Sequence, residues 1–158
     1  MANPYIQILI ESLEEKDKVL DEVIIADDQQ MEIVRGERPD MKALDASIKA
    51  KGALVDRLNK LDDGFESVYE KVREDLLEHK EEHRDEIKRL QELISRITEK
   101  SVAIEAAEAR NKDLVETYFR MEKKKIKSSR NLTKAANTYA VNMHKINKID
   151  SFFVDHKK

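Results

Sequence analysis

The chain has 158 residues, of which 40% are charged and only 5% aromatic, and its formal net charge is −3. This composition excludes a thick globular core and favours a thin helical bundle whose outer faces are solvated. All three glycines and both prolines lie within the first 64 residues, which leaves little room for strands and turns. We therefore expect an all-α protein with a single domain over residues 1–158.

The sequence also limits where the protein works. It contains no cysteine, which excludes disulfides and thiolate metal sites and suits a reducing compartment. No apolar run approaches the roughly 20 residues of a membrane span. The opening residues lack the basic segment and apolar core of a signal peptide. A cytoplasmic protein without a membrane span is the expectation.

A first helix is predicted over about 4–34. Asn3 is a suitable N-cap, and Pro4 suits the first helical turn. Gly36 and Pro39 end the helix, and so short a loop makes the next helix an antiparallel neighbour. One face of this first helix carries regularly spaced apolar residues: Ile6, Ile10, Leu13, Leu20, Ile24, Met31 and Val34.

A helical hairpin is predicted next, with arms over about 40–79 and 84–127. Both arms carry apolar residues at alternating three and four spacings, and a run of charged residues and histidines over 79–85 separates them. Folding the chain about Glu81 places Asp62 opposite Lys100 as an ion pair, and Lys51 opposite Asn111 as a polar layer. The fold expected is thus an elongated antiparallel hairpin, or coiled coil. Being shorter, the first helix should cover the base of the hairpin and leave its charged tip projecting.

A short amphipathic helix is predicted over about 131–147, followed by a tail over 148–158 that contains Phe152 and Phe153. About four turns of helix are marginal in water, so this segment should dock on the third helix. Residues 120–158 carry a net charge of +8, whereas the first 119 carry −11. The simplest interpretation is that the basic end meets the acidic body of the same molecule.

Small residues of the two arms fall at one level, which indicates either close helix packing or a shallow groove for another helix. We predict that this level and the amphipathic segment form a partner-binding site. Its predicted residues are Ala103, Ala106, Ala107, Leu132, Ala136, Tyr139 and Met143. Docked there, the segment would occupy a surface that a partner helix also uses.

Catalytic motifs do not emerge from the sequence. The run from His79 to His83 matches the H-x-x-E-H pattern of some zinc peptidases, but it lies at an expected exposed tip. No glycine-rich phosphate loop or nucleophile elbow is present. We expect neither an enzyme nor a protein that binds a metal or cofactor.

Several stretches carry a resemblance to a known family. They are Asn3-Pro4-Tyr5-Ile6, Leu61-Asp62-Asp63-Gly64-Phe65, residues 87–94, Glu108-Ala109-Arg110-Asn111-Lys112 and residues 151–158. Together they resemble the FlgN/FliT-type flagellar export chaperones of clostridia-like bacteria. The resemblance implies a cytoplasmic helical chaperone, monomeric or loosely dimeric. It would bind the terminal helices of hook-associated or filament-cap proteins before type III export. The export apparatus is a second partner that the resemblance implies.

Two alternatives stay open. A structural coiled-coil spacer or dimeric adaptor would cover its apolar seam with a second copy of itself. A weaker alternative is a nucleic-acid or membrane-surface binder that acts through the basic end. Because the lysine run is short, has no interleaved aromatic residues and belongs to an acidic protein, we expect no nucleic-acid partner.

Overall fold

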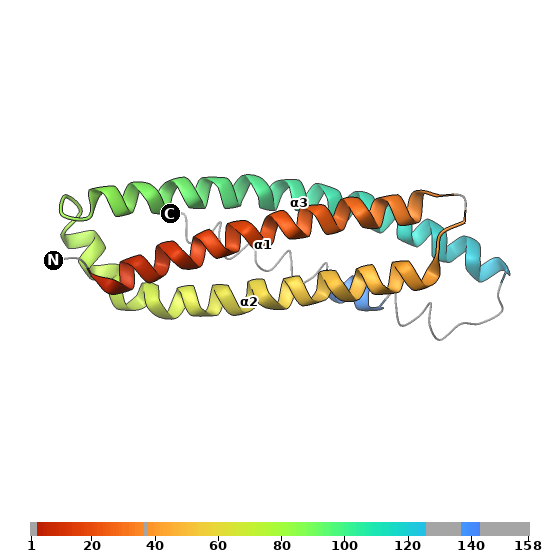
Figure 1. Cartoon of the computed structure of the whole chain (residues 1–158), viewed down its shortest axis with the longest axis horizontal. Coiled ribbons are helices and arrows are strands. Elements are labelled where there is room, and N and C mark those ends of the chain that lie inside the picture. The colour runs from red at the N-terminus through yellow and green to blue at the C-terminus, as the bar shows by residue number, and fades with distance from the viewer. Residues whose placement is uncertain (1–2, 37, 126–136, 143–158) are drawn as a thin grey trace.

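The computed structural model describes residues 3–36, 38–125 and 137–142, and its chain path is drawn in Figure 1. It contains three long helices: α1 (Pro4–Arg35), α2 (Met41–Glu78) and α3 (Arg84–Lys125). Residues 137–142 are also helical, and we call them the 137–142 segment. The described residues contain no strand, so the expected all-α class is confirmed. Of the amphipathic helix predicted over 131–147 only this segment is described, and the tail 148–158 lies outside the described residues.

Local signals in the sequence set where the first two helices begin. The side chain of Asn3 accepts a hydrogen bond from the Tyr5 amide at 3.0 Å, directly before Pro4. The Asp40 side chain does the same for α2, accepting from the amides of Lys42 and Ala43 at 2.9 and 3.3 Å. Each cap satisfies amides that have no acceptor within the first helical turn.

Helix α1 lies between the other two helices. The chain runs along α1, returns along α2 and runs forward again along α3, so that α1 and α3 are parallel (Figure 1). Backbone contacts join α1 to both α2 and α3 along their lengths, and none of comparable extent joins α2 to α3. The predicted hairpin therefore exists as a chain path with its turn over 79–83. Its arms do not pair as a two-stranded coiled coil, because α1 occupies the seam between them.

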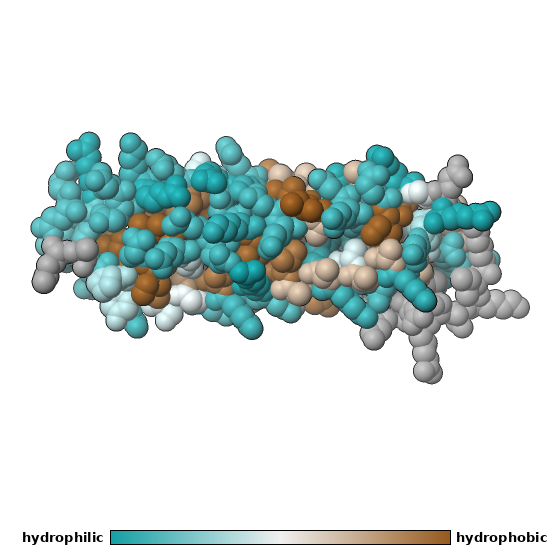
Figure 2. Space-filling model, viewed as in Figure 1, coloured by the Kyte–Doolittle hydropathy of each residue, from teal (hydrophilic) through white to brown (hydrophobic). Residues whose placement is uncertain are grey.

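The apolar core falls into two clusters. The larger cluster joins all three helices from the turn over 79–83 to the level of Val23. The smaller lies at the opposite end and consists of Val34, Leu44, Ile48, Val115 and Tyr139. The surface of the molecule is mostly polar, with apolar patches where α1 lies against its neighbours (Figure 2). Within the described residues, no helix combines the length and apolar character needed to cross a membrane.

Buried ion pairs set the register of α1 against both neighbours. Lys16 is 1% exposed and its Nζ lies 2.7 Å from Asp62 Oδ1 on α2. The adjacent Asp17 lies 2.6 Å from Lys100 Nζ and 2.7 Å from Arg96 Nη2 on α3. The predicted Asp62–Lys100 pair is therefore wrong. Both side chains are paired, but each pairs with α1, which the two-stranded register did not include.

The first helix also covers more of the hairpin than predicted. Asn3 Nδ2 donates a hydrogen bond to Asp75 Oδ2 at 3.1 Å, close to the end of α2. This hydrogen bond lowers the pKa of the Asp75 carboxyl below its usual range, and the electrostatic attraction of His83 lowers it further. The expectation that α1 packs only on the base is wrong, since α1 nearly matches α2 in length and begins at the turn.

The prediction that the whole tip is exposed is wrong at His83. It is 4% exposed, its Nε2 lies 3.1 Å from Asp75 Oδ2, and its carbonyl accepts from the Ile87 amide at 2.8 Å. His79 and Glu82, by contrast, are exposed as expected. His83 thus joins the turn to the end of α2 and, through Asp75, to the start of α1.

The two histidines should differ in their contribution to stability. We expect His83→Ala to lower the free energy of unfolding by about 1–3 kcal/mol, because a buried hydrogen bond and its packing are lost. His79→Ala, the matched control, should change it by less than about 0.5 kcal/mol. Urea denaturation followed by circular dichroism measures both. Equal effects of the two substitutions would contradict the buried position of His83.

Candidate functional site

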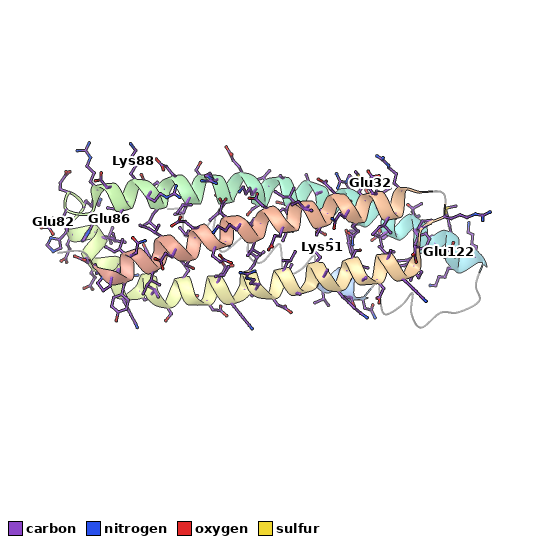
Figure 3. All side chains as sticks on the ribbon, viewed as in Figure 1. Glu32, Lys51, Glu82, Glu86, Lys88 and Glu122 are labelled. Carbon is purple, nitrogen blue, oxygen red and sulfur yellow. The ribbon has the colours of Figure 1, made fainter. Side chains whose placement is uncertain are left out.

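A buried charged layer separates the two apolar clusters. Its centre is Lys51 of α2, which is 0% exposed and lies between α1 and α2 in the view of Figure 3. The ammonium group donates to Asp27 Oδ1 at 3.1 Å, Gln30 Oε1 at 2.9 Å and Glu108 Oε2 at 2.9 Å. Asn111 completes the layer by donating to the Asp27 carbonyl at 2.8 Å and to Gln30 Oε1 at 3.2 Å. We call these five residues the Lys51 layer.

The three N–H groups of Lys51 are surrounded by the acceptor groups of Asp27, Gln30 and Glu108, and Glu108 Oε1 also lies 2.7 Å from Nζ, so the ammonium group is fully hydrogen-bonded although it is buried. The acceptors come from α1 and α3, and the layer therefore ties all three helices together at one level. The expected polar layer of Lys51 and Asn111 is present, with Gln30 bridging the two side chains. The α3 carboxylate that binds Lys51 belongs to Glu108, one helical turn before the residue placed opposite it in the predicted register.

Two carboxyl groups share the single lysine. Burial, followed by a hydrogen bond with Glu108, raises the pKa of Asp27 from 3.8 to about 8. Asp27 Oδ2 lacks a hydrogen-bond donor among the described residues. A proton on Asp27 provides a donor for Glu108 and leaves one negative charge beside one positive charge. The layer is then electrically neutral, as a water-free site requires.

The 137–142 segment closes the layer from the side of α2 and α3. Tyr139 is 4% exposed, and its hydroxyl donates to the Glu108 carbonyl at 2.8 Å. Its ring centroid lies 4.8 Å from Lys51 Nζ, within the range of a cation–π interaction. One turn later, Asn142 Nδ2 donates to the Ile48 carbonyl at 2.9 Å. We call the surface formed by Ile48, Lys51, Gly52 and Glu108 the docking surface.

Gly52 makes room for this contact. A Cβ atom built on Gly52 would lie 3.1 Å from Asn142 Oδ1 and 3.2 Å from Nδ2, closer than most Cβ contacts. Gly64 on the same helix offers the contrast, since a Cβ there would meet nothing within 4 Å. A glycine within a helix weakens the helix by about 1 kcal/mol relative to alanine. At position 52 the missing side chain allows a second segment to approach α2.

Of the predicted binding residues that the structure describes, Tyr139 lies at the docking surface and the alanines of α3 do not. Tyr139 lies at the centre of the docking surface, whereas Ala103 and Ala106 are exposed on α3 and Ala107 is half-buried. Leu132, Ala136 and Met143 lie outside the described residues. Tyr139 thus docks against Lys51 and Glu108, and its part in partner binding stays a prediction. The small residues of α3 do not surround it.

Sequence reasoning did not select the charged residues of the layer as site residues. Asp27, Lys51 and Glu108 each interrupt an amphipathic pattern at a position where an apolar residue is expected. Three such interruptions from three helices were the available signal. Asn142 carried no comparable signal, because its role depends on the space above Gly52.

The two histidines of the H-x-x-E-H pattern do not converge on a metal site. His83 is turned toward Asp75, while His79 Nδ1 lies 3.9 Å from Glu82. Across residues 3–36, 38–125 and 137–142, no group of three or more histidine or carboxylate side chains is arranged to hold a metal ion.

No protein-family model matches the chain, and neither a curated protein nor a solved structure with significant similarity to it was found.

Removal of the central cation should be costly. We expect Lys51→Met to lower the free energy of unfolding by about 3–5 kcal/mol, because two carboxyl groups remain buried without their lysine. Lys49→Met is the matched control, since Lys49 is exposed and, among the residues that the structure describes, forms its ion pair with Asp45 of the same helix. It should change stability by about 0.5 kcal/mol or less. Guanidinium denaturation gives both values, and similar losses would show that Lys51 is not the centre of a buried layer.

The raised pKa of Asp27 predicts a pH dependence of stability. Asp27 ionises near pH 4 in the unfolded chain and near pH 8 in the folded protein. Its contribution to the free energy of unfolding is therefore fully present below pH 4 and is lost as the pH rises to 8, because only the folded state holds the proton in that range. Asp27→Asn keeps a neutral donor for Glu108. Its stability relative to the wild type should increase from pH 5 to pH 8.5, by at most about 1.4 kcal/mol per pH unit. Parallel stability curves for the two proteins would contradict the assignment.

Proposed function

We propose that this protein is a chaperone that binds helical segments of another protein. The observation that carries the proposal is the docking surface itself. A bundle of three helices buries a tyrosine and an asparagine of a further helical segment against two of its helices. Helix-in-groove recognition uses the same elements, namely a helical ligand with a few anchoring side chains on one face.

The identity of the cargo rests on the sequence resemblance to FlgN/FliT-type chaperones. On that basis we propose that the cargo is the terminal helical segment of a flagellar hook-associated or filament-cap protein, bound in the cytoplasm before type III export. Cargo would use the docking surface and compete there with the 137–142 segment. A partner helix that contacts more of the bundle than the described residues 137–142 do would displace this segment, because binding to the folded bundle shifts the exchange by mass action.

Burial of the apolar seam favours a binding protein over a coiled-coil spacer. Helix α1 covers the faces of α2 and α3 that a second copy would otherwise have to cover. The large apolar side chains that remain exposed in the described chain are spread over all its helical elements: Tyr5, Ile8, Ile25, Leu77, Val102, Met121 and Val141. They form no continuous seam of the kind that a coiled-coil dimer requires.

Binding to purified cargo tests the proposal. The full chain should form a complex with a terminal segment of a hook-associated or cap protein, detected by light scattering after size-exclusion chromatography. Tyr139→Ala should raise the affinity by about tenfold, because it weakens the competing segment. Val141→Ala is the matched control, since Val141 is 53% exposed, and should leave the affinity unchanged. A tight dimer that binds no terminal segment would support the spacer or adaptor instead.

A further inference from the structure

We infer that the docking surface selects helices that present an aromatic residue and, three positions later, an asparagine. The inference rests on the proposed function and specifies its ligand as a helix with the pattern Tyr-x-x-Asn. The chain's own 137–142 segment displays this pattern with Tyr139 and Asn142. A partner helix that takes its place has to meet the same buried groups.

The aromatic position is defined by the Lys51 layer. The ring contacts the buried ammonium group of Lys51, and Asp27 and Glu108 lie directly beside it. A basic side chain there would be repelled by Lys51, and an acidic one by the Glu108 carboxylate, which carries the negative charge of the layer when Asp27 holds a proton. A neutral ring avoids both penalties and still attracts the cation. The hydroxyl adds a hydrogen bond to the Glu108 carbonyl, so tyrosine is preferred to phenylalanine.

The asparagine position is defined by α2. The carboxamide lies against Gly52 and donates to the Ile48 carbonyl at 2.9 Å. Ile48 and Asn142 are both buried, so water does not readily replace this donor. Aspartate would place a negative carboxylate against the carbonyl oxygen, whereas alanine would leave the donor missing. The Gly52 contact also leaves little space for a longer side chain.

The spacing lets one helical turn contact two helices. Residues three apart lie on the same face of a helix, so the first anchor reaches Glu108 of α3 while the second reaches Ile48 of α2. Around the anchors, Asn137, Ala140 and Val141 are exposed, whereas Thr138 is half-buried. The three exposed positions are therefore free to vary, and the two fully buried anchors and their separation define the pattern.

Peptide binding to a variant with weakened internal anchors tests the inference. The host is the full chain with Tyr139→Ala and Asn142→Ala, and the probe is a labelled peptide with the sequence of residues 130–149. Fluorescence anisotropy should show saturable binding. Replacing the peptide tyrosine by leucine or its asparagine by aspartate should weaken binding at least about tenfold, and phenylalanine for tyrosine about threefold. Substitutions at the peptide's Ala140 and Val141 positions should have little effect.

Two glycines of the host provide a matched control. Gly52→Ala should weaken the Tyr-x-x-Asn peptide but not a Tyr-x-x-Ala peptide, because only the carboxamide meets the new methyl group. Gly64→Ala should affect neither peptide. Both substitutions replace a helical glycine by alanine, so any difference between them isolates the Asn142 contact. Asn142→Ala alone provides a second host that keeps Tyr139, should the double variant lose helicity by circular dichroism.

The outcomes separate this inference from the proposed function. If purified cargo binds but leucine, aspartate and the Gly52 substitution make no difference, the Tyr-x-x-Asn pattern is wrong and the chaperone proposal stands. If neither the peptide nor the cargo binds either host, both fail. Selective binding of the Tyr-x-x-Asn peptide without any binding of export cargo would support the recognition pattern and remove the flagellar assignment.

Discussion

The buried ammonium group of Lys51 is the constraint on which the middle of this bundle depends. A lysine removed from water needs a counter-charge and three acceptors, and here they come from α1 and α3. Any shift of one helix along another by a turn would leave Lys51, Asp27 or Glu108 buried without its partner. Apolar packing alone tolerates such shifts, because heptad patterns repeat. The Lys51 layer therefore fixes the register that the apolar clusters only approximate.

A second set of ion pairs fixes the register of the helices nearer the turn. Lys16 and Asp17 are adjacent in sequence, yet one reaches α2 and the other reaches α3. Neighbouring residues on a helix point about 100° apart, so this divergence is possible only if α1 lies between the two helices. Helix length alone predicted that α1 lies beside the base of the hairpin. The two sets of ion pairs together explain why α1 instead lies between α2 and α3.

The same layer connects structure to recognition. A charged group buried at the centre of the bundle has to be covered on every side, and the side facing away from α1 is covered by Tyr139. The stability of the layer and the occupancy of the docking surface are therefore linked. A bundle with an ordinary leucine at position 51 would have less need of an aromatic covering residue, and less means of distinguishing one helical partner from another.

The sequence by itself determined the helices. Caps at Asn3 and Asp40, the apolar spacing and the charged run over 79–85 are local features, and each acts within a few residues. The sequence also indicated that the short amphipathic segment containing Tyr139 has to pack on apolar surface nearby, but it did not indicate which buried groups the segment meets. Only the tertiary structure decided that α1 enters the seam, that Asp62 and Lys100 pair with α1, and that His83 is buried. Those outcomes depend on which helix faces satisfy buried charges together, and a two-helix register that omits the third helix cannot contain that information.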